Sequence, residues 1–94
     1  THARTGFTQE EARAVAARIG LAFEDVPFDV EQFRRGMDVE LEHGSHDPQT
    51  DVTGDDPIVT GKIALAHMKE FPDYYERLAR MEREAEAEWS ERGT

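Results

Sequence analysis

Hydrophobic residues recur every three or four positions in four segments of the chain, and this spacing predicts four helices and no strand. The first helix is expected over residues 9–19. Thr8 is its predicted N-cap, and Glu11 is placed to complete a capping box. The apolar stripe of this helix consists of Ala12, Val15, Ala16 and Ile19. Gly20 follows as the left-handed residue that commonly ends a helix.

The second helix is expected over residues 30–43 and begins with the same signals. Asp29 is the predicted N-cap with Gln32 at the third helical position, and Gly44 ends the pattern. One face of this helix carries Phe33, Met37, Glu40 and Leu41. Gly36 lies inside it, where glycine costs about 1 kcal/mol relative to alanine, so we expect it to permit the close approach of another backbone.

The third helix begins at Asp56–Pro57, an N-cap followed by proline in the first turn, and is expected to reach Phe71. Its predicted buried face carries Ile63, Ala66, His67, Glu70 and Phe71. Pro72 disfavours helical geometry at the preceding residue, which predicts a sharp bend rather than one continuous rod. The fourth helix is expected over residues 73–91. Its predicted seam is Tyr74, Leu78, Met81 and Ala85.

Beyond Met81 the fourth helix is polar nearly all round. We therefore predict that residues 82–94 form a projecting acidic helical tail unless Trp89 finds a partner. A polar loop of residues 44–56 separates the second and third helices and is longer than most connections. A chain of 94 residues supplies one hydrophobic core and not two. Residues 1–94 are thus expected to form a single compact all-α domain of four helices.

Charge and composition exclude several classes of function. The chain has 21 Asp and Glu against 11 Lys and Arg, and its net charge of -10 disfavours nucleic acid and anionic membranes as partners. A basic protein surface or a cation suits this charge better. The absence of cysteine excludes disulfides, thiolate zinc sites and cysteine nucleophiles, and we expect a cytoplasmic protein. No apolar run approaches the ~20 residues of a membrane span. The chain begins at Thr1 without a methionine, which leaves room for a segment upstream.

Two carboxylate–imidazole pairs form the candidate site. Glu40 and His43 lie three residues apart at the end of the second helix. His67 and Glu70 repeat this spacing near the end of the third helix, so antiparallel packing could bring all four side chains to one point. Glutamate and histidine at this spacing bind Zn, Fe, Mn or Ni in helical bundles. A mononuclear two-His, two-Glu site for a divalent transition metal is one hypothesis. A di-iron centre would need further inward glutamates, which the first and fourth helices do not offer.

Two other interpretations of these groups stay open. The helix dipole favours an imidazolium at His43, and a carboxylate could orient His67 as a core histidine. These groups would then form a structural polar network, the interpretation that we favour. Acid–base catalysis by the same groups is the third. Tyr74 is expected in the core, and Tyr75 either at the surface or with its hydroxyl near His67.

The polar loop contains a second candidate site. Its acidic residues are Asp47, Asp51, Asp55 and Asp56. These hard oxygen ligands could gather around calcium, but their spacing differs from that of an EF-hand loop. A solvated loop that caps the third helix is the favoured interpretation.

Three segments of the chain carry a resemblance to a known family: residues 33–44 (FRRGMDVELEHG), 51–53 (DVT) and 60–75 (TGKIALAHMKEFPDYY). With them, the region from about Phe28 to Glu84 resembles a family of small, functionally uncharacterised proteins of bacteria and their phages, known as a domain of unknown function. The resemblance implies a shared helical fold, in which the ELEHG and AHxxExPDYY segments belong to the family's pattern. It implies no activity. The first helix is less characteristic of the family.

Together these observations predict a small acidic accessory or interaction protein without catalysis of its own, in which Glu and His groups form a structural network. The expected partner is another protein or a second copy of the chain. The alternative is a metal-binding protein, which could be an enzyme. Its predicted ligands are Glu40, His43, His67 and Glu70.

Overall fold

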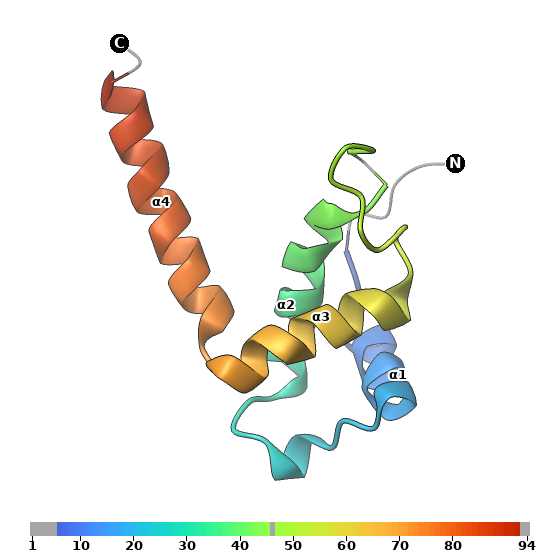
Figure 1. Ribbon diagram of the computed structural model, residues 1–94. Helices are drawn as coiled ribbons and strands as arrows, with labels where there is room; N and C mark the ends of the chain where they lie inside the picture. The colour runs from blue at the N-terminus through green and yellow to red at the C-terminus, as the bar shows by residue number, and fades with distance from the viewer. Residues whose placement is uncertain (1–5, 46, 93–94) are drawn as a thin grey trace.

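The computed structural model describes residues 6–45 and 47–92, over which the chain forms four α-helices and no strand (Figure 1). The helices are α1 (Gln9–Ile19), α2 (Val30–Glu40), α3 (Pro57–Glu70) and α4 (Tyr74–Arg92). Short 3-10 turns, Phe23–Asp25 and Leu41–His43, lie before and after α2. The all-α, four-helix prediction is therefore confirmed. In this described part of the chain, no helix combines the length and apolar character needed to cross a membrane.

Side-chain caps set the starts of the first three helices, as predicted. Thr8 accepts a bond from the N–H of Glu11 at 3.1 Å, and Glu11 accepts one from the N–H of Thr8 at 2.9 Å. Asp29 and Gln32 form the same capping box, with both bonds at 2.8 Å. Asp56 caps α3 by accepting the N–H two residues further on, at 2.8 Å. Each cap satisfies a donor that a helix N-terminus leaves unpaired and stabilises the helix by about 1 kcal/mol.

The helices α1, α2 and α3 pack around one core, and α2 contacts each of the other three (Figure 1). The apolar face of α2 is buried as predicted, with Phe33 and Met37 fully enclosed. The buried residues of α1 are Ala12, Val15 and Ala16, which belong to its predicted stripe. Phe7 and Phe28, each directly before an N-cap, are also buried. Burying a large apolar side chain in this way stabilises the folded state by about 1.5–3 kcal/mol.

The buried face of α3 differs from the predicted one. Its buried residues are Thr60, Gly61, Ala64 and Met68, whereas the predicted Ala66, Glu70 and Phe71 are exposed. Because α3 packs against both α1 and α2, its contact face must admit their side chains closely. A Cβ added at Gly61 would overlap the side chain of Val15 on α1. The prediction was wrong because it followed the large hydrophobic residues, while three of the four residues buried on this face, Thr60, Gly61 and Ala64, are small.

The loop between α2 and α3 is held by one of its own aspartates. A 3-10 turn replaces the last turn of the predicted second helix, and Gly44 ends it with an extended backbone, φ -101°, rather than a left-handed one. Asp55, at φ 63°, accepts bonds from the N–H of Ser45 at 2.9 Å and from its hydroxyl. The carboxylate of Asp55 fills the space that a Cβ on residue 44 would need. A glycine is therefore required here by packing and not by its backbone angle.

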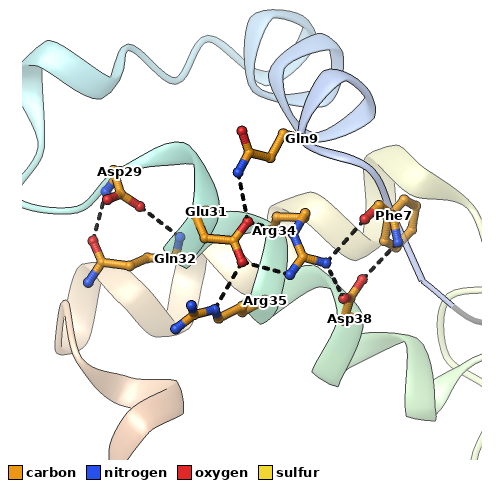
Figure 2. Close-up of polar contacts among 8 residues, drawn as sticks. All are labelled: Phe7, Gln9, Asp29, Glu31, Gln32, Arg34, Arg35 and Asp38. Atoms are coloured by element: carbon orange, nitrogen blue, oxygen red, sulfur yellow. Dashed lines mark hydrogen bonds and ion pairs between the residues drawn. The ribbon is translucent and has the colours of Figure 1, made fainter.

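An ion-pair network ties the start of α1 to α2 (Figure 2). Arg34 donates two bonds to the carboxylate of Glu31, at 2.8 and 2.7 Å, and one to Asp38 at 2.6 Å. Asp38 also accepts the N–H of Phe7 at 2.8 Å, and Arg34 donates to the Phe7 carbonyl at 3.2 Å. Gln9 of α1 donates to Glu31 at 3.0 Å. Bidentate, charge-assisted bonds of this kind fix geometry as well as adding energy.

The network stabilises the charged form of Glu31. The hydrogen bonds from Arg34, followed by the bond from Gln9, hold the pKa of the Glu31 carboxyl well below its usual range. The bond to Glu31 in turn raises the pKa of the Arg34 guanidinium. A carboxyl whose folded-state pKa is depressed contributes stability above its unfolded pKa, about 4.3 for glutamate, and loses it as the pH falls toward the folded-state value.

We therefore expect the free energy of unfolding of the wild type to exceed that of Glu31→Gln near neutral pH. The difference should narrow as the pH falls from about 5 to about 3, because unfolded Glu31 takes up a proton there and folded Glu31 does not. Urea titrations of both proteins across this range measure the difference. A gap that is independent of pH would contradict a role for the Glu31 charge.

Candidate functional site

Glu40 is a carboxylate in the protein interior. It lies at the end of α2 and is 5% exposed. Its Oε2 accepts a hydrogen bond from the Tyr75 hydroxyl of α4 at 2.7 Å, and Nε2 of His67 on α3 lies 3.6 Å from the same oxygen. Three helices thus each contribute one polar side chain to one point. Because burying a carboxylate is costly unless it is hydrogen-bonded, the Tyr75 hydroxyl offsets part of that cost.

The rings of His67, Tyr74 and Tyr75 pack against one another at this contact. The imidazole of His67 stacks on the Tyr74 ring, with centroids 4.4 Å apart and planes at 10°. The Tyr75 ring meets His67 edge-on at 6.2 Å and Tyr74 edge-on at 5.0 Å. Tyr75 is the more deeply buried of the two tyrosines, whereas Tyr74, the expected core residue, is half-buried. The Tyr75 hydroxyl lies at the Glu40–His67 contact, which matches the second of its two predicted placements.

Gly36 makes room for the Tyr75 ring. It lies one turn before Glu40 on the same face of α2. A Cβ added to Gly36 would lie 2.6 Å from Cε2 of Tyr75, closer than non-bonded atoms approach. The ring therefore passes across the glycine, and its hydroxyl reaches the carboxylate one turn further on. The expectation that Gly36 admits another backbone was wrong, since it admits an aromatic side chain.

The environment of Tyr75 keeps its hydroxyl protonated. Burial raises the pKa of Tyr75 most, and its hydrogen bond to Glu40 and the charge of that carboxylate raise it further. All three causes disfavour the phenolate. At neutral pH Tyr75 is therefore a hydrogen-bond donor and not a proton acceptor, which suits a structural contact between α4 and α2.

Comparison with known proteins places this region in a family. The model of the family described as "Protein of unknown function (DUF5661)" matches residues 12–84. The chain belongs to the DUF5661 family. No curated protein and no solved structure matches this chain. The DUF5661 match begins at Ala12, so it includes most of α1 as well as the region from Phe28 that the resemblance covers. The Glu40 contact and Gly36 lie inside the DUF5661 region, and Trp89 lies beyond it.

The structure brings together two of the four predicted metal ligands in the DUF5661 region. Glu40 and His67 meet, whereas His43, in the 3-10 turn, and Glu70, at the end of α3, are exposed. On α3, residues three apart differ by about 60°, so Glu70 can face solvent while His67 reaches Glu40. His43 lies in the 3-10 turn and not in the α-helix that the prediction assumed. Among the described residues, no three His, Asp or Glu side chains are arranged to hold a metal ion. The metal site stays a prediction that this geometry does not favour.

The aspartates of the loop bond to the loop itself. Asp47 accepts the N–H of Gln49 at 3.0 Å, and Asp51 accepts the N–H of Gly54 at 2.7 Å. Asp55 holds Ser45, and Asp56 caps α3, as described above. Each of the four carboxylates thus accepts a bond from a backbone N–H of the loop or of the first turn of α3. This arrangement agrees with the capping interpretation and gives no support to the calcium interpretation.

A hollow of about 200 Å³ lies between α2 and α4. Its apolar lining comes from Val39, Met68, Tyr75 and Ala79, and its polar lining from Gln32, Arg35 and Glu76. Glu40 and His67 do not line it. The hollow marks where α4 diverges from α2, and the buried carboxylate does not open onto it.

Tyr75→Phe tests whether the DUF5661 region depends on the hydroxyl. This substitution keeps the ring but removes a donor from a buried carboxylate, so we expect the free energy of unfolding to fall by about 1–3 kcal/mol. Tyr74→Phe is the matched control, because it removes a hydroxyl from the neighbouring half-buried ring and should change stability by less than about 0.5 kcal/mol. Denaturant titrations compare the two, and equal losses would contradict the role given to Tyr75.

Proposed function

We propose that this protein is a small, acidic, cytoplasmic interaction protein without catalysis of its own, and that it binds its partner through the outer half of α4. The observation that carries this proposal is the exposure of Met81 and Trp89, at 55% and 71%. The two side chains lie on one face of a helix that is otherwise strongly polar there. We call Met81, Ala85 and Trp89 the α4 strip.

The α4 strip continues a face that begins in the core. Successive residues turn by about 100° around an α-helix, which places Tyr74 and Leu78 on the same face as the α4 strip. Both pack against the core of the protein. Figure 1 shows α4 leaving α2 and α3 and extending away from them. The apolar face is therefore partly buried along its first half and exposed further out. Exposed apolar patches of this kind commonly mark binding sites.

The charge beside the α4 strip indicates what kind of surface would cover it. Four glutamates and one arginine occur between Glu82 and Glu88. A partner that presents an apolar stripe flanked by Lys or Arg would bury Met81 and Trp89 and pair with these carboxylates. Tryptophan is also the residue type that most often dominates binding energy at protein interfaces.

The Glu40–Tyr75 contact supports the same proposal from the inner end of α4. It secures the first turns of α4 to α2, so that the outer half is presented at a defined angle and not as a loose tail. In this account the buried Glu, His and Tyr groups have a structural role, and binding depends on residues that lie more than a turn away.

Binding to a synthetic amphipathic helix with a leucine stripe and lysine flanks tests the proposal, with Trp89, the one tryptophan of the chain, as the fluorescent reporter. We expect Met81→Glu to weaken binding tenfold or more, because it places a charge in the apolar strip. Ala87→Glu adds the same charge on the opposite, exposed face of α4 and should leave binding unchanged or slightly stronger. Absence of binding by the wild type, or equal effects of the two variants, would contradict the proposal.

A further inference from the structure

We infer that the partner of the α4 strip is a second copy of the chain, with the two α4 helices antiparallel and crossing at Met81. This inference rests on the proposed function and names the surface that the strip binds. The required surface has an apolar stripe with basic flanks, and the inner half of α4 has both. Tyr74 and Leu78 supply the stripe, and Arg77 and Arg80 are exposed beside it.

The charges along one edge of the α4 face divide into two halves. Arg77, Arg80, Glu84 and Glu88 all lie on the same side of Met81, within a sector of about 80° on the helix. The two arginines precede the centre of α4 and the two glutamates follow it. All four are exposed, and Arg77 also donates to Asp73 of its own chain at 2.9 Å. The opposite edge of the apolar face carries Glu82 and Glu86 further out and the buried Tyr75 further in.

An antiparallel pair brings this edge of one helix against the same edge of the other. A two-fold axis at Met81 places residues at equal distances before and after it side by side. Arg77 and Arg80 of one copy then face Glu84 and Glu88 of the second copy, and the reverse contacts repeat by symmetry. A parallel pair would instead place this edge against the opposite edge of the second copy, so that Glu84 and Glu88 would face Glu82 and Glu86. The charge pattern therefore favours the antiparallel arrangement over the parallel one.

The apolar residues follow the same symmetry. Met81 meets its own copy at the axis, and Ala85 lies near the level of Leu78 of the second copy. Trp89, about 12 Å further along the helix than Met81, reaches the level of Tyr74 of the second copy. Tyr74 and Leu78 are half-buried and present part of their surface to a partner. Two crossed helices bury less than the ~1,200 Å² of the smallest stable complexes, so the dimer should be weak. The net charge of -10 on each copy also opposes association beyond the screening length of about 8 Å.

Sedimentation velocity from about 5 to about 300 µM, at ~0.15 M salt, tests the inference on the full chain. We expect a monomer–dimer equilibrium with a dissociation constant of order 10–100 µM. Arg80→Glu and Glu84→Arg should each weaken the dimer at least tenfold, because each places like charges together. An equimolar mixture of the two variants should dimerise at least as strongly as the wild type, because their edges are complementary again.

The matched control is Arg83→Glu. It makes the same change in net charge as Arg80→Glu but lies on the exposed face of α4 away from the strip, so it should leave the dimer within about twofold of the wild type. Circular dichroism of each variant checks that α4 remains helical. Equal weakening by Arg80→Glu and Arg83→Glu would overturn the proposed arrangement.

A wild-type chain that remains monomeric at about 300 µM would also overturn the inference. Binding of the lysine-flanked helix then separates the two proposals. If the monomer binds that helix through Met81, the self-pairing is wrong and the proposed interaction function stands. If the chain binds neither a second copy nor the lysine-flanked helix, the self-pairing and the proposed interaction function are both wrong.

Discussion

The hydrogen bond from Tyr75 to Glu40 determines where α4 joins the rest of the protein. It connects the first turn of α4 to the last turn of α2, and His67 of α3 lies against the same carboxylate oxygen. Leaving a buried carboxylate without a hydrogen-bond donor would lower the free energy of unfolding by more than the net contribution of the bond itself. The burial of Glu40 therefore depends on Tyr75. The bond is possible because Gly36 has no side chain. The position of α4, and therefore of everything that α4 presents, depends on this contact.

Anchoring α4 at one end has consequences for the surface. Tyr75 is buried and Tyr74 and Leu78 are half-buried against the body of the protein, while the same face continues outward to Met81 and Trp89, which are exposed. A helix held along its whole length would hide this face, and a helix without an anchor would not present it in a fixed direction. For the proposed binding function, the glutamates around the strip favour a partner whose apolar surface has basic flanks. The inner half of α4 meets that description within the same chain.

Local signals predicted the local parts of this structure, while contacts between distant residues escaped them. The capping boxes at Thr8 and Asp29 and the apolar faces of α1 and α2 depend on residues within one or two turns, so the sequence contains all that is needed. The face of α3 depends instead on which side chains α1 and α2 present to it, and there the large hydrophobic residues misled the prediction. The bonds of Arg34 and Asp38 to Phe7 join residues about thirty positions apart and left no periodic signal.

The candidate site shows the same division. The structure brings Glu40 and His67 of the predicted site into contact, but their expected companions at three-residue spacing face solvent. The true third member is Tyr75, whose hydroxyl had two predicted placements. A signal was present in the sequence, since Gly36 and Glu40 share a face of α2 four residues apart. A glycine followed one turn later by a buried acid indicates a cavity for a long side chain that ends in a donor.

The most direct test of this account is the effect of Gly36→Ala in two backgrounds. In the wild type the new methyl group collides with the Tyr75 ring, so the free energy of unfolding should fall by about 1–3 kcal/mol. In Tyr75→Ala the ring is gone, and the same substitution should raise stability by up to about 1 kcal/mol, because alanine favours a helix more than glycine does. Denaturant titrations of the four proteins give both values. A change of the same sign and size in both backgrounds would show that Tyr75 does not depend on Gly36 and would contradict the account.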